Sequence, residues 1–135
     1  NKRMIVNYLG FNICVMICYD LRFPVWARNV GNEYDLLIYV ANWPASRIRV
    51  LDALLTARAL ENQAYVCGIN RLGDDGENLH YNGHSRLIDY KGNDLLDIYP
   101  NETQIKTTEI LLEPLQDFRK KFPVWKDADK FTIEN

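Results

Sequence analysis

The stretch ICYDLRFPVWARN, residues 17–29, places a cysteine between an apolar run and a group of polar side chains. Cys18 could be a buried filler, a metal ligand, or a nucleophile held at the end of a strand. Free cysteines are usually buried and inert, and Cys14 and Cys67 lie inside apolar runs that fit this interpretation. Cys18 differs because polar residues follow it at once and a helix is expected next. A thiol there is near free backbone amides, which favour thiolate.

Polar residues next to Cys18 and at the end of the following apolar run are candidates for a pocket. Asn42, Trp43 and Pro44 end that run, where they could line a site or simply turn the chain. Strands that run parallel end at the same edge of a sheet, which favours the pocket. Arg22 could pair with a carboxylate near the site or bind an acid group of a substrate.

The two histidines, His80 and His84, are the other residues that could ligate a metal or serve a cysteine hydrolase. They fall in a predicted loop and at a predicted hairpin edge. No further cysteine or carboxylate completes a ligand pattern around them. The acidic segment 73–78 lacks the alternating oxygen ligands of a calcium loop. The sequence therefore predicts no metal site.

The elements that would position these residues alternate between strands and helices. Near-continuous apolar runs predict strands buried on both faces of a sheet, at 11–19, 34–43 and 64–70. Helical spacing predicts helices at 24–31, 45–63 and 112–122. We expect Asp20 to cap the first helix and Ser46 to cap the second, and we expect Arg58 to pair with Glu61 along the second helix. The later chain predicts a loop at 71–83, a hairpin turning at 91–93 and a strand at 107–113. This order indicates an α/β fold.

The composition is that of a single globular domain. The chain has 135 residues, a formal net charge of −2 and 47% hydrophobic residues. Its basic residues are scattered, which argues against a nucleic-acid or membrane partner. No apolar run approaches the roughly 20 residues of a membrane span, and the first residues do not resemble a signal peptide. Three unevenly spaced cysteines predict reduced thiols and a cytoplasmic location.

Five segments together resemble the nitrilase, or carbon–nitrogen hydrolase, superfamily. They are CYDLRFPVWARN, YDLLIYVANWPASR, LLTARALENQAYVCGINRLG, GHSRLIDYKGN and RKKFPVWKDAD. The branch that the chain is most similar to is that of the ω-amidases. These enzymes hydrolyse the terminal amide of 2-oxoglutaramate or 2-oxosuccinamate.

The resemblance implies a four-layer α-β-β-α sandwich, of which residues 1–135 would be the C-terminal portion with the N-terminal portion absent. It implies that Cys18 is the nucleophile and that the backbone N–H of Tyr19 helps to hold the oxyanion. The family's general-base Glu and oxyanion-stabilising Lys precede the cysteine by many residues, so they cannot be assigned within this chain. The resemblance also implies no cofactor, a pocket wall that includes Arg22, Asn42, Trp43 and Pro44, and a homodimer or larger homo-oligomer.

Three functions follow as hypotheses. The first is hydrolysis of a dicarboxylate monoamide through a thioester on Cys18. The second keeps this chemistry but changes the amide to deaminated glutathione or an N-carbamoyl compound. The third is a non-catalytic half-domain with a role in assembly. Because the base and the Lys are missing, we expect the isolated chain to be nearly inert.

Overall fold

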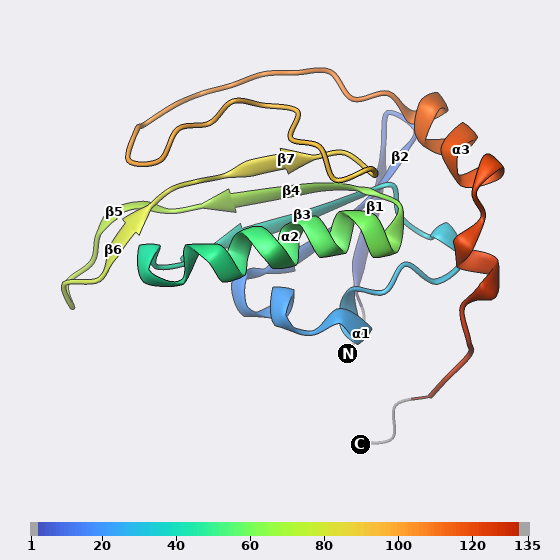
Figure 1. The fold of residues 1–135 in the computed structure, drawn as a ribbon, viewed down its shortest axis with the longest axis horizontal. Coiled ribbons are helices and arrows are strands. Elements are labelled where there is room, and N and C mark those ends of the chain that lie inside the picture. The colour runs from blue at the N-terminus through green and yellow to red at the C-terminus, as the bar shows by residue number, and fades with distance from the viewer. Residues whose placement is uncertain (1–2, 133–135) are drawn as a thin grey trace.

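A mixed β-sheet with helices on one face forms the centre of the computed structural model, which describes residues 3–132 (Figure 1). In these residues the main sheet has five strands in the order β1-β2-β3-β4-β7, and a separate hairpin pairs β5 with β6. The main strands are β1 (Met4–Tyr8), β2 (Phe11–Ile17), β3 (Leu36–Ala41), β4 (Tyr65–Asn70) and β7 (Arg86–Ile88). The hairpin strands are β5 (Leu72–Asp74) and β6 (His80–Asn82).

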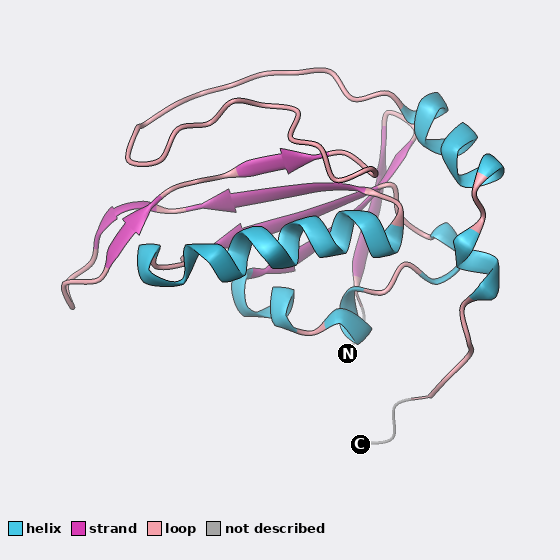
Figure 2. Cartoon of the chain, in the orientation of Figure 1, coloured by secondary structure: helices cyan, strands magenta, loops and turns pink. Residues whose placement is uncertain are grey.

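The helices are short except for one. The α-helices are α1 (Pro24–Ala27), α2 (Ile48–Asn62) and α3 (Leu112–Lys121), as Figure 2 shows. The 3-10 helices are η1 (Cys18–Arg22), η2 (Val30–Asn32), η3 (Ala45–Arg47) and η4 (Val124–Asp127). Within residues 3–132, no helix combines the length and the apolar character that crossing a bilayer requires.

The three central strands run parallel, as their apolar runs predict, and the α/β class is confirmed. Residues that pair across neighbouring strands share one face of the sheet. One such row contains Met16, Tyr39 and Gly68, and it faces α2. A side chain at Gly68 would place its Cβ 2.4 Å from Leu55 of α2. Glycine therefore lets this helix pack directly on β4.

A buried arginine fastens α3 to the sheet. Arg119 donates to Asp35 at 2.7 Å and to the backbone carbonyls of Tyr34 and Gln63, both at 2.8 Å. The Arg119 side chain is 6% exposed, and desolvation lowers its pKa below the ordinary value. Asp35 also accepts from the backbone N–H of Asn12 at 2.9 Å. This network joins residues that lie more than 80 positions apart.

The opposite face of the sheet is apolar and exposed. The row of Ile17, Val40 and Ile69 alternates with the buried row, and these side chains are 66%, 43% and 50% exposed. Met4 and Val6 extend the same face onto β1. The prediction that the central strands are buried on both faces is therefore wrong for the described residues. An apolar surface of this extent is typical of a face that packs against another layer.

Several predicted elements need correction. Residues 107–113 do not form a strand, because no strand in the described chain pairs with them; α3 already begins at Leu112. The predicted loop 71–83 instead contains the β5–β6 hairpin. The predicted hairpin at 91–93 forms a turn, but within residues 3–132 only one isolated bridge, between Ile88 of β7 and Asp94, joins its two sides. Ser46 does not cap α2, whose N-cap is Arg47 without a side-chain bond.

Candidate active site

Cys18 lies where β2 ends and η1 begins, in an unusual backbone conformation. Its φ angle is +41°, in the left-handed region that L-residues other than glycine rarely adopt. Asp20 closes this turn by accepting the backbone N–H of Ile17 at 3.0 Å. It does so instead of capping the next helix, the role expected for it. The strained turn places the Cys18 thiol at the carboxyl edge of the sheet, 3.9 Å from the carbonyl oxygen of Asn42.

A surface cavity of about 410 Å³ opens beside this thiol. Its volume falls within the range of small-molecule sites. It is lined by residues from the ends of the three parallel strands: Ile17, Cys18, Val40, Ala41, Asn42, Ile69, Asn70 and Arg71. The structure thus brings Cys18 and Asn42 together. It adds Asn70 and Arg71, which our sequence analysis did not single out.

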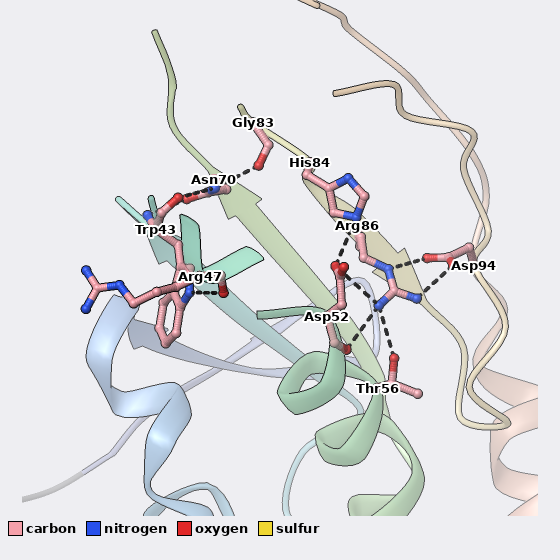
Figure 3. Close-up of polar contacts among 9 residues, drawn as sticks. All are labelled: Trp43, Arg47, Asp52, Thr56, Asn70, Gly83, His84, Arg86 and Asp94. Atoms are coloured by element: carbon pink, nitrogen blue, oxygen red, sulfur yellow. Dashed lines mark hydrogen bonds and ion pairs between the residues drawn. The ribbon is translucent and has the colours of Figure 1, made fainter. Parts of the chain in front are cut away.

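Asn70 holds the rim of the cavity in place. Its side chain is 8% exposed, donates to the carbonyls of Trp43 at 3.0 Å and Gly83 at 2.7 Å, and accepts the N–H of Trp43 at 2.7 Å (Figure 3). These bonds fix the backbone next to Asn42. A sequence signal for Asn70 existed: like Asn42, it is a polar residue that ends an apolar strand.

The other predicted pocket residues lie close by but do not line this cavity in residues 3–132. Trp43 and Pro44 are buried, and the Trp43 indole donates to the carbonyl of Arg47 at 2.8 Å. The Arg22 guanidinium stacks over the Trp43 ring at 5.0 Å and over the Tyr19 ring at 5.7 Å. Among the described residues it has no carboxylate partner within 4.0 Å. Its contact with a substrate stays a prediction.

The position of the Tyr19 backbone N–H is compatible with a role as an oxyanion donor. Tyr19 is the second residue of η1, and the first N–H groups of a helix have no acceptor within the helix. Such groups can hold a developing negative charge on oxygen. The role of this N–H as an oxyanion donor stays a prediction.

The remaining cysteines lie inside strands, and each of the two histidines contacts an aspartate; His80 lies in β6 rather than in the predicted loop. Cys14 is fully buried and Cys67 half-buried, and burial raises the pKa of both thiols. His80 bonds to Asp74 at 2.8 Å, and His84 lies 3.0 Å from Asp52. In residues 3–132, no three side chains of the metal-ligating types cluster.

Two ion pairs connect elements of the fold. The predicted pair of Arg58 with Glu61 is present at 2.9 Å, and Arg58 also donates to the carbonyl of Leu21 in η1. Arg86 binds Asp94 through two bonds and reaches α2 at Thr56 (Figure 3). The hydrogen bond from Arg58 to Leu21 connects α2 to the turn that carries Cys18.

Comparison with known proteins decides the family. A sequence model of carbon–nitrogen hydrolases matches residues 3–120. The chain belongs to the carbon–nitrogen hydrolase family. The resemblance seen in the sequence is confirmed, and so is the nitrilase-like fold.

Individual carbon–nitrogen hydrolases resemble the chain over almost its whole length. The omega-amidase YafV of Escherichia coli is 50% identical over 133 residues, which are 98% of this chain and 52% of that protein. The 2-oxoglutaramate amidase of Bacillus subtilis is 37% identical over 116 residues, which are 85% of this chain and 44% of that protein.

A solved structure of a carbon–nitrogen hydrolase has the same fold. It is XC1258 of Xanthomonas campestris, a superfamily protein with an arsenic adduct in the active site. It superposes with a TM-score of 0.95 at 39% identity, covering 99% of this chain and 53% of XC1258. The chain therefore spans about half the length of the relatives it matches.

Proposed function

We propose that this chain carries the nucleophile of an amidase, with Cys18 forming a thioester with a small carboxamide. The observation that carries the proposal is the Cys18 thiol, held by a strained turn at the sheet edge beside a cavity of substrate size. The similarity to the omega-amidase and the 2-oxoglutaramate amidase favours a dicarboxylate monoamide such as 2-oxoglutaramate or 2-oxosuccinamate.

The reaction would proceed in two covalent steps. A general base takes the proton of the Cys18 thiol, and the sulfur attacks the amide carbon to form a C–S bond. The oxyanion is held by the Tyr19 N–H and by a cation. The C–N bond then breaks, the nitrogen takes the proton and ammonia leaves. Water attacks the thioester, and the carboxylic acid and the free thiol are released.

The described residues supply only part of this machinery. The cavity is lined by neither a carboxylate nor a lysine from residues 3–132. The family resemblance assigns the base to a Glu and the oxyanion cation to a Lys, both outside this chain. Losing one oxyanion donor alone typically lowers a rate about 10²–10³-fold. The chain by itself should therefore be nearly inactive.

Residues 1–135 are, in this proposal, the C-terminal portion of a single carbon–nitrogen hydrolase domain. Two observations support it: the half-length match to relatives, and the exposed apolar sheet face around Ile17, Val40 and Ile69. A second sheet would cover this face and bring the missing Glu and Lys to the cavity. The complete arrangement, which we call the assembled enzyme, is the four-layer sandwich.

The decisive experiment reconstitutes the assembled enzyme. This chain is co-expressed with the part of the Escherichia coli relative that lies outside the match, and ammonia release from 2-oxoglutaramate is measured. We expect activity that Cys18→Ala abolishes and that the chain alone lacks. Activity only on deaminated glutathione or an N-carbamoyl compound would support the second hypothesis. A stable complex that hydrolyses no amide would support the non-catalytic alternative.

Assembly and location complete the proposal. The protein acts in the cytoplasm on a small molecule, without a cofactor, a nucleic acid or a membrane, and forms a homodimer or larger homo-oligomer. Exposed apolar residues near the C-terminal segment support self-association, since Val30 and Phe131 are 64% and 51% exposed. Light scattering of the assembled enzyme tests this, and a monomer would contradict it.

A further inference from the structure

Arg71 is the charged residue that lines the cavity beside Cys18 in the described chain. It follows β4 directly, and its backbone N–H donates to the carbonyl of Ala41 at 3.0 Å, so its position in the sheet is fixed. The other lining residues are apolar or neutral. A cation among apolar and neutral residues favours a ligand that carries a negative charge.

The Arg71 guanidinium is oriented by neutral partners, and its charge also acts on the nearby Asp75 carboxylate without a direct ion pair. One Nη donates to the backbone carbonyl of Asp74 at 2.8 Å, and the group lies 4.7 Å from the centre of the Tyr81 ring. No carboxylate of residues 3–132 lies within 4.0 Å of it. Asp75, which follows Asp74, already accepts the Tyr81 hydroxyl at 2.9 Å and two backbone N–H groups. Most of the five guanidinium N–H donors of Arg71 therefore remain for a ligand.

The separation of Arg71 from Cys18 suits a short dicarboxylate monoamide. The two residues end strands that are separated by β3, so their backbones lie roughly 9–10 Å apart. Four carbon–carbon bonds separate the amide carbon from the distal carboxylate carbon in a five-carbon monoamide, a span of about 5 Å. Attack on the amide needs a further distance of about 3–3.5 Å. These two lengths add up to about 8–8.5 Å, which places the distal carboxylate near the strand end that carries Arg71.

We propose that Arg71 binds the distal carboxylate of the amide substrate and so selects monoamides of dicarboxylic acids over neutral amides. This rests on the proposed amidase function and names the residue that determines its substrate class. The two-pronged guanidinium matches a carboxylate in geometry as well as in charge. Arg22, the arginine expected in this role, stacks on Trp43 and lies outside the cavity lining.

Ligand binding tests the proposal without requiring catalysis. Glutarate, a dicarboxylate without an amide, is titrated into the assembled enzyme, and backbone amide shifts of this chain are followed by NMR. We expect saturable shifts at Cys18 and Arg71 that weaken roughly 10- to 100-fold in Arg71→Gln. The exposed Arg49→Gln serves as a control and should bind as the unchanged chain does. Neutral glutaramide should bind equally to all three proteins. An unchanged glutarate affinity in Arg71→Gln, or no binding to the unchanged chain, would overturn the assignment.

Kinetics of the assembled enzyme then separate the two proposals. Arg71→Gln should raise KM for 2-oxoglutaramate roughly 10- to 100-fold and leave hydrolysis of butyramide unchanged. Arg71→Lys, which keeps the charge but loses the fork, should recover part of the loss. An equal loss on both amides would show that Arg71 only supports the fold. If glutarate binds through Arg71 but no amide is hydrolysed, the amidase function fails while the carboxylate site stands.

Discussion

Replacing Cys18 by glycine should stabilise the fold relative to alanine, although both changes remove the proposed nucleophile. The φ angle of Cys18 is +41°, and a side chain in the left-handed region costs about 1–2 kcal/mol. Alanine keeps this strain, whereas glycine relieves it. Glycine also gives the unfolded chain more conformational entropy, which lowers the stability of the fold by about 0.5–1 kcal/mol and offsets part of this gain. The difference leaves Cys18→Gly more stable than Cys18→Ala by about 0.75 kcal/mol at the middle of these ranges.

Cys14 offers a matched control on the same strand. It lies within β2, fully buried and without a positive φ, so glycine there relieves no strain, makes the unfolded chain more flexible and removes a buried methyl group. Cys14→Gly should therefore be less stable than Cys14→Ala, the opposite order to that at Cys18. Urea unfolding followed by tryptophan fluorescence gives all four free energies. If glycine is the less stable choice at both positions, the strained turn at Cys18 is refuted.

Three further predictions concern the core and the thiols. Arg119→Ala leaves the buried carboxylate of Asp35 without its ion-pair partner and should lower the free energy of unfolding in urea by about 3–5 kcal/mol. Lys120→Ala removes an exposed ion pair on the same helix and should lower it by under about 0.5 kcal/mol. Similar losses in the two variants would contradict the role of the Arg119 network. Iodoacetamide should label Cys18 before Cys14 and Cys67, because burial raises the pKa of those two thiols. Mass spectrometry that finds Cys14 or Cys67 labelled first would contradict this prediction. Burial also raises the pKa of Tyr34 above its ordinary value. Because Tyr34 then ionises at lower pH in the unfolded chain than in the folded one, stability should fall as pH rises above about 10. Tyr34→Phe should make the free energy of unfolding less dependent on pH in this range, and an unchanged slope would refute this prediction.

The local pattern of the sequence was sufficient for the elements that carry the site. Apolar runs predicted β2, β3 and β4, and helical spacing predicted α2 with its pair of Arg58 and Glu61. These elements are long, and their burial gives a strong periodic signal. The position of Cys18 at the end of a strand, and its neighbourhood with Asn42, followed from parallel strands ending at one edge.

Short elements and side-chain partners depended on tertiary contacts. The β5–β6 hairpin has three residues a strand, too few for a pattern, and the apolar segment 107–113 lacks a strand to pair with in the described chain. Asp20 was expected to cap the helix that follows, but its carboxylate accepts the N–H of Ile17 instead. A hydrogen bond or a ladder forms only where a partner lies in space, and spacing along the chain does not show this.

The sequence by itself determined that a thiol stands at the rim of an α/β sheet, and which family this chain belongs to. Only the tertiary structure decided which cation shares that rim with the thiol. Arg22 is nearer to Cys18 in sequence, but its guanidinium packs against an indole. Arg71 reaches the same cavity because β4 lies two strands away from β2 in the sheet, a proximity that hydrogen bonding between strands creates.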